Sequence, residues 1–216
     1  IMSSDWSSDV CSSDLVDLER LRALAEEGRQ APLLGGRYLA WWGGLVALAY
    51  LLHYAFLTAL LPGGPAVLGW LWVAFAAVGL GGQQLLVRGE PAERPGRGAV
   101  GNRVELSSWQ FAGAALAAYF LALAGHSVVS GAVNPQFQTS VLLVFAVYAV
   151  ALGTTGVLGH SRILVRAGGA AIAAVALSAW YAQSPALWLI GSAASLLTAL
   201  LPGLLLLRAE RAAIAA

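Results

Sequence analysis

Long apolar runs alternate with short polar segments along most of the chain. A helix that rises about 1.5 Å per residue needs about 20 apolar residues to cross the hydrocarbon core of a membrane. Six runs are long enough, at residues 38–61, 66–87, 107–130, 138–158, 164–182 and 186–207. The pattern therefore predicts an all-α, polytopic membrane protein, in which residues 31–211 form a domain of six transmembrane helices and residues 212–216 form a C-terminal tail.

The arginines predict how these spans are oriented. The chain has 12 basic residues, all of them arginine, and they lie before the first predicted span, between the second and third, around the start of the fifth, and after the sixth. The other connections carry none. Because Lys and Arg accumulate in short cytoplasmic loops, both termini are predicted to be cytoplasmic. The predicted basic cytoplasmic face includes Arg88, Arg94, Arg97, Arg103, Arg162 and Arg166.

Tryptophan supports the same orientation, because its amphipathic ring prefers the headgroup level of a membrane. One group of tryptophans follows the arginines closely, and a second group lies near the uncharged connections at the other end of the spans. The predicted inner group is Trp41, Trp42 and Trp109, and the predicted outer group is Trp70, Trp72, Trp180 and Trp188.

The first fifteen residues differ in composition from the rest of the chain. Ser-Ser-Asp occurs three times between residues 3 and 14, and residues 5–15 closely resemble one reading frame of a common sequencing adapter. We interpret residues 1–15 as a disordered artefact, and we expect the natural start of the protein, ahead of Val16, to be missing. Cys11 is the only cysteine and falls in this segment, so no disulfide or thiolate site is expected in the natural chain.

Residues 16–30 are predicted to form a cytoplasmic amphipathic helix. Leu18, Leu21 and Ala25 recur at helical spacing, while Glu and Arg occupy the other faces. Such a helix is either an element that docks a partner or the membrane surface, or a solubilising segment ahead of the first span. The second interpretation is favoured.

The connection at residues 88–103 is rich in Gly, Pro and charge, and is predicted to be a mobile cytoplasmic loop. Residues 96–101 match the G-x-G-x-x-G pattern of dinucleotide-binding proteins. That pattern binds a nucleotide only between a strand and a helix, whereas a membrane span precedes it here, so we interpret the match as a coincidence. Asn102 and Glu105 are predicted to form an N-cap and its capping-box partner at the start of the third span.

Ionisable groups are scarce within the predicted spans. Their interiors contain no Asp, Glu or Lys, and Arg166 lies close enough to the inner face to extend toward it. Proton-coupled antiport, ion pumping and voltage sensing use such groups, so the sequence argues against all three. The chain also lacks the Gly-x-Ser-x-Gly and His-Glu-x-x-His motifs of hydrolases, and we predict no catalytic residue.

His53 and His126 are the candidates for cofactor binding. Both lie toward the outer ends of neighbouring odd-numbered spans, where two imidazoles could ligate haem or a metal. Counting from Trp42 and Trp109 places them at different depths, whereas counting back from the following prolines places them level. The favoured alternative is that both hydrogen-bond within the bundle or to interfacial water, with no metal site and no cofactor. His160 is predicted to be an interfacial residue.

Small and polar residues indicate how the helices pack. Residues 167–179 of the fifth span are nearly all Gly, Ala and Ser, which allows neighbouring backbones to approach closely. This span is predicted to be central in the bundle, or alternatively to form a surface for self-association. Hydrogen bonds across helices are predicted for Gln83, Gln84, Thr154 and Thr155.

The composition, rich in Ala, Gly and Arg without Lys, indicates a high-GC bacterial genome. The leading prediction is a multi-pass inner-membrane protein without enzymatic activity, which acts through a protein partner at its basic cytoplasmic face and binds no nucleic acid. One alternative is a small transporter or substrate-binding membrane component for a neutral or lipophilic compound. Another is a haem or metal redox protein that uses His53 and His126.

Overall fold

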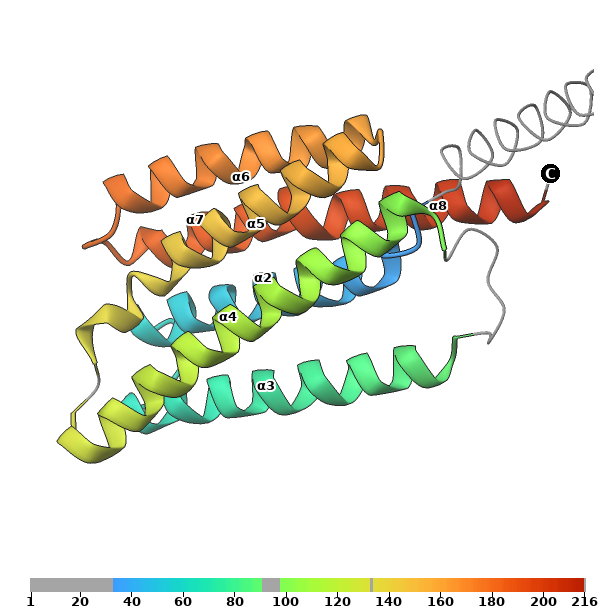
Figure 1. The fold of residues 1–216 in the computed structure, drawn as a ribbon. Coiled ribbons are helices and arrows are strands. Elements are labelled where there is room, and N and C mark those ends of the chain that lie inside the picture. The colour runs from blue at the N-terminus through green and yellow to red at the C-terminus, as the bar shows by residue number, and fades with distance from the viewer. Residues whose placement is uncertain (1–32, 91–97, 133, 216) are drawn as a thin grey trace, which may run out of the picture.

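The computed structural model describes residues 33–90, 98–132 and 134–215, which form a bundle of helices (Figure 1). Six helices in this part of the chain are long and apolar enough to cross a membrane, as the apolar runs predict. The predicted artefact at residues 1–15 and the predicted amphipathic helix at 16–30 lie outside the described residues, as do Arg94 and Arg97.

The first four spans are α2 (Gly36–Leu57), α3 (Pro65–Arg88), α4 (Val100–Ser130) and α5 (Ser140–Leu158), with a short 3₁₀ turn, η1 (Pro135–Phe137), ahead of α5. The fifth is α6 (Arg162–Trp180). The sixth joins α7 (Ala186–Ser195), a π-helical turn η2 (Leu196–Leu200) and α8 (Leu201–Ala215). The residues predicted to be a separate C-terminal tail from 212 onward therefore continue α8 as far as Ala215.

Two span boundaries differ from the sequence prediction for local reasons. The first span ends at Leu57 rather than at 61, because Thr58 ends the helix and Ala59 adopts a positive φ of 58°, which a right-handed helix does not allow. The third span begins at Val100 rather than at 107. It therefore includes the polar residues that the prediction placed at its edge.

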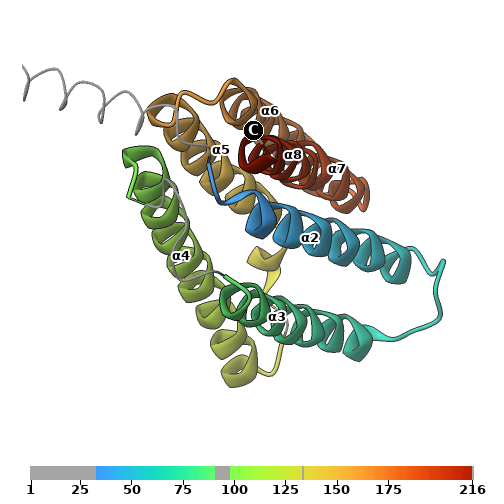
Figure 2. The same cartoon turned by 90° about the vertical axis from the view of Figure 1, so that its right-hand side faces the viewer.

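The core lies between α2, the sixth span, α5 and α6. Helix α2 packs against α7, η2 and α8, and α5 packs along α6. Tyr50, Phe145, Leu152 and Trp188 are fully enclosed there. Helix α3 packs mainly on α2, and α4 mainly on α5, so both lie at the margin of the bundle (Figure 2). Only 6% of the apolar window of α3 or α4 is buried within the bundle, against 50% for the sixth span, so most of the apolar surface of these two helices faces outward.

Glycines set how closely the central helices approach. A Cβ placed on Gly36 of α2 would lie 2.9 Å from the carbonyl oxygen of Gly203 in α8, and one on Gly168 of α6 would lie 3.0 Å from the backbone nitrogen of Gly153 in α5. These contacts are typical of small-residue packing between membrane helices. One small-residue face of α6 is thus used inside the bundle, while its Gly169 faces open space.

The exposure of the tryptophans does not follow the predicted inner and outer groups. Trp70 and Trp180 are exposed, as expected of residues at the headgroup level. Trp188 is only 1% exposed and belongs to the core, and Trp72 packs against that core. The assignment of Trp188 to an interfacial belt was therefore wrong. Position along a span indicates depth, but it does not show which side of the helix faces other helices.

Candidate functional site

The arginines gather at one end of the bundle. Figure 1 shows one end of the bundle where three helices begin and three helices end. The helices that begin there are α2, α4 and α6, and those that end there are α3, α5 and α8. Arg37 is half-buried and forms an ion pair there. The other arginines in the described residues are exposed on four helices, namely Arg88 of α3, Arg103 of α4, Arg162 and Arg166 of α6, and Arg208 and Arg211 of α8. We call this the arginine end.

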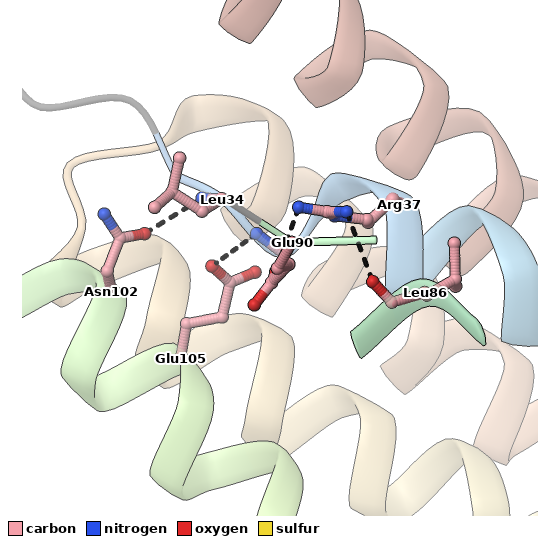
Figure 3. Close-up of polar contacts among 7 residues, drawn as sticks. Leu34, Arg37, Leu86, Glu90, Asn102 and Glu105 are labelled. Carbon is pink, nitrogen blue, oxygen red and sulfur yellow. Dashed lines mark hydrogen bonds and ion pairs between the residues drawn. The ribbon is translucent and has the colours of Figure 1, made fainter. Parts of the chain in front are cut away.

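At the arginine end, polar side chains connect α2, α3 and α4 (Figure 3). The Arg37 guanidinium lies 3.0 Å from the Glu90 carboxylate and donates a 3.4 Å hydrogen bond to the carbonyl oxygen of Leu86 in α3. From α4, Asn102 and Glu105 reach the chain that enters α2. We call the side chains of Arg37, Glu90, Asn102 and Glu105 the inner polar layer.

Glu105 accepts a hydrogen bond from the start of a helix that is not its own, and Asn102 binds the residue just before that helix start. Helix α4 begins after Ala99 without a side-chain cap bond, so the predicted capping box is wrong. Instead the Leu34 N–H donates to Asn102 Oδ1 at 2.9 Å, and the Gly35 N–H donates to Glu105 Oε2 at 3.1 Å. Gly35 is the N-cap residue of α2, and the first N–H groups of a helix have no partner within it. Helix α4 therefore supplies one acceptor to the N-cap N–H of α2, from Glu105, and a second to the residue ahead of the cap, from Asn102.

Two buried carboxylates lie near the ends of the spans, just outside the residues that the sequence assigns to the span interiors. Glu105 is 4% exposed within α4, and Glu210 is 4% exposed within α8. Both were missed because the predicted spans began at 107 and ended at 207, which left each glutamate just outside. The available signal was the spacing of Asn102 and Glu105, since residues three apart share one face of a helix.

Indole groups of α2 bind α3 next to this layer. Trp41 Nε1–H donates to the carbonyl oxygen of Gly79 at 3.1 Å, and Trp42 Nε1–H donates to Gln83 Oε1 at 2.9 Å. The predicted cross-helix hydrogen bond of Gln83 is therefore confirmed. The Thr154 hydroxyl instead donates to the carbonyl oxygen of Val150 in its own helix, at 2.7 Å.

His53 lies toward the other end of α2, in a cluster of aromatic rings. Its imidazole stacks on Trp188 of α7 with ring centroids 3.6 Å apart, and Trp72 Nε1–H of α3 donates to His53 Nδ1 at 3.1 Å. Phe137 of η1 and Tyr50 of α2 complete the contacts with Trp72 and Trp188. We call His53, Tyr50, Trp72, Phe137 and Trp188 the His53 cluster. It joins four elements that are distant in sequence.

The hydrogen bond from Trp72 decides which imidazole nitrogen carries the proton. An indole N–H can only donate, so Nδ1 of His53 accepts and carries no hydrogen, which leaves the proton on Nε2. A metal-binding histidine uses one nitrogen as the ligand and donates the other N–H to a fixed acceptor. His53 as arranged has the opposite polarity, so it could not ligate haem or a metal without losing Trp72.

The two candidate histidines have different environments. His53 is buried in its cluster, whereas His126 is exposed on the marginal helix α4. In the described residues, no group of three or more His, Cys, Asp or Glu side chains is placed to hold a metal ion. His160, predicted to be interfacial, is exposed in the turn between α5 and α6 at the arginine end.

Comparison with known proteins adds no family. No protein-family model, no curated protein and no solved structure gives a significant match to the chain. The arguments about function therefore start from the geometry alone.

Proposed function

We propose that the chain is a multi-pass protein of a bacterial inner membrane, with both termini in the cytoplasm, that acts through a protein partner bound at the arginine end. The proposal rests on one difference at this end: the carboxylates have partners within the protein, whereas most of the arginines are exposed. The carboxylates of Glu90 and Glu105 bind Arg37 and the backbone of Gly35, while six arginines on four helices are exposed. The described residues of this end therefore expose arginines on four helices, whereas the Glu90 and Glu105 carboxylates have partners within the protein.

The polar groups inside the bundle support a structural role for the interior. Most of the hydrogen bonds of the inner polar layer and the His53 cluster join one helix to another or to the chain that enters it, although Arg37 Nε and Glu105 Oε1 are buried without a hydrogen-bond partner among the described residues. Recognition is then left to the exposed arginines, which suit an acidic surface because charge complementarity between partners accelerates encounter and selects orientation. The cytoplasmic placement follows from the accumulation of basic residues in short cytoplasmic loops.

Photo-crosslinking in living cells tests this proposal. A photoreactive residue at Gly89, exposed beside Arg88, leaves every arginine in place. We expect a protein adduct of discrete size, and we expect it to weaken when Arg88→Gln is added. The matched control is the same photoreactive residue at Trp180, which is 82% exposed at the opposite end. Adducts from Trp180 but none from Gly89 would contradict the proposal.

One observation favours a second candidate, a membrane component that binds a neutral or lipophilic compound. Trp72, Phe75, Phe120 and Phe137 are only partly buried, and their rings contact one another across α3, α4 and η1. Aromatic surfaces of this kind bind apolar ligands. This candidate requires a compound that raises the melting temperature of the purified protein and has no effect on a Phe120→Ala variant.

A further inference from the structure

Two tyrosines of the core carry hydroxyls that are not used within the bundle. Tyr50 of α2 is 2% exposed and Tyr148 of α5 is 5% exposed, yet neither hydroxyl forms a hydrogen bond with any residue that the structure describes. Tyr148 lies near the middle of α5, away from the water at either end of the span. A polar group without a partner is costly in hydrocarbon, so both hydroxyls are suited to a molecule from outside the described residues.

A glycine of α7 allows the Tyr50 ring to reach from α2 toward α5. A Cβ placed on Gly191 would lie 2.8 Å from Cδ2 of Tyr50 and 3.1 Å from Cγ1 of Val141 in α5. The ring therefore occupies the space that a larger residue at this position would fill. Tyr50 and Tyr148 are consequently near enough to interact electrostatically.

His53 supplies a third polar group from the same helix as Tyr50. The two residues are three apart, which places them on one face of α2, and both rings contact Trp72 and Trp188. Because Nδ1 of His53 accepts from Trp72, the proton is on Nε2, and this N–H has no acceptor among the described residues. His53 can therefore only donate to a further molecule.

These three groups differ from the sealed hydroxyls of the bundle. Three side-chain hydroxyls of the described residues lack a partner and are fully enclosed, namely those of Thr155, Ser178 and Ser195. The hydroxyls of Tyr50 and Tyr148 and Nε2 of His53 lack a partner but are not enclosed in this way, so the small exposed part of each side chain includes its polar atom. The three polar atoms are therefore open to a bound molecule.

Aromatic rings of the two marginal helices border this site. Trp72 of α3 contacts Tyr50, and Trp109 of α4 contacts Tyr148, with ring centroids 5.8 and 5.3 Å apart. Both tryptophans are only partly buried, and α3 and α4 pack mainly on different central helices (Figure 2). Sites for small molecules are typically apolar with a few polar groups that fix the orientation of the ligand. The surroundings of the two tyrosines have this composition.

We propose that Tyr50, Tyr148 and His53 bind the carbonyl oxygens of a neutral, apolar ring compound of the quinone type. Carbonyl oxygens accept the O–H and N–H hydrogen bonds that these side chains can donate. A planar ring packs favourably against aromatic side chains, and no charge on the ligand is required, because the three groups are themselves neutral. This inference rests on the second candidate function, for which it names the class of ligand.

The full chain, purified in detergent, provides the test with duroquinone and durene. The two compounds share a ring with four methyl groups, and only duroquinone carries carbonyl oxygens. We expect duroquinone to raise the melting temperature at a lower concentration than durene. Tyr50→Phe and Tyr148→Phe each remove only a hydroxyl, and each should need roughly 5-fold more duroquinone for half of the shift, because one hydrogen bond contributes about 1 kcal/mol.

The matched control is Tyr181→Phe, which removes the same group from a side chain that is 41% exposed and should bind duroquinone as the unaltered protein does. No shift with duroquinone, or unaltered binding in both Tyr50→Phe and Tyr148→Phe, would overturn the inference. Equal shifts with the two compounds would also overturn it, and this comparison uses the unaltered protein, so it decides even if a substitution lowers the melting temperature. If those equal shifts disappear in Phe120→Ala, the second candidate function still stands.

Discussion

Replacement of Glu105 tests whether one helix caps another inside this bundle. In Glu105→Ala the partly buried Gly35 N–H loses its acceptor, the nearly buried Glu105 carboxylate, and a buried donor without a partner costs about 1–3 kcal/mol. Glu105→Gln keeps an acceptor oxygen at the same reach and removes a buried negative charge. We therefore expect the free energy of unfolding to fall by about 1–3 kcal/mol in the Ala variant, and to change by less than about 1 kcal/mol in the Gln variant.

The assay is equilibrium unfolding in dodecyl maltoside with increasing sodium dodecyl sulfate, followed by far-ultraviolet circular dichroism. Ser107→Ala is the control, because the exposed Ser107 hydroxyl bonds only to backbone carbonyls within its own helix. The capping argument is refuted if the Gln variant loses as much stability as the Ala variant, or if the Ala variant loses no more than the control.

Three further predictions address other contacts. Gly43→Ala should destabilise the protein by about 1–3 kcal/mol through overpacking, because the added Cβ would lie 2.8 Å from the carbonyl carbon of Ala199. The control is Gly44→Ala, which has room for a Cβ and should be neutral or slightly stabilising in the same unfolding assay. Equal effects of the two substitutions would contradict the described packing. His160→Gly should stabilise by roughly 1 kcal/mol, since a side chain at positive φ is strained; a loss of stability would show that His160 makes a contact worth more than this strain. Trp72→Phe keeps one aromatic ring but removes the pyrrole part of the indole with its donor to His53 Nδ1, and should cost at least about 1 kcal/mol. If His53→Ala then destabilises the Trp72→Phe variant as much as it destabilises the unaltered protein, the two residues are not coupled.

The number of spans and their approximate positions could be predicted because a membrane requires long apolar helices whatever their partners are. The apolar pattern could not separate α3 and α4 from the central helices, since lipid-facing and core-facing surfaces are both apolar. Leu80 of α3 and Leu152 of α5 belong to similar runs, yet Leu80 is 58% exposed and Leu152 is fully buried. Only the packing of helices against one another distinguishes them.

The residues of the candidate sites could be predicted from the sequence, but the residues that they contact could not. The arginines were visible as a charge pattern, and Asn102 with Glu105 was visible as a capping pair. The backbone that this pair binds, at Leu34 and Gly35, lies 68 and 70 residues earlier in the chain, and no local signal encodes that distance. The same holds for His53, whose partners Trp72 and Trp188 come from two other helices. The hydrogen bond from Trp72 places the imidazole proton of His53 on Nε2, and this arrangement argues against a metal-ligating role.

The side of the membrane occupied by the arginine end is the most direct test of the whole interpretation, because the proposed cytoplasmic partner can reach the arginines only from that side. Alkaline phosphatase, active only outside the cytoplasm, is fused after Ala216 in one version of the protein and inserted at Gly64, between α2 and α3, in another. We predict an inactive fusion at Ala216 and an active insertion at Gly64. The reverse result, an active fusion at Ala216 with an inactive insertion at Gly64, would contradict the orientation.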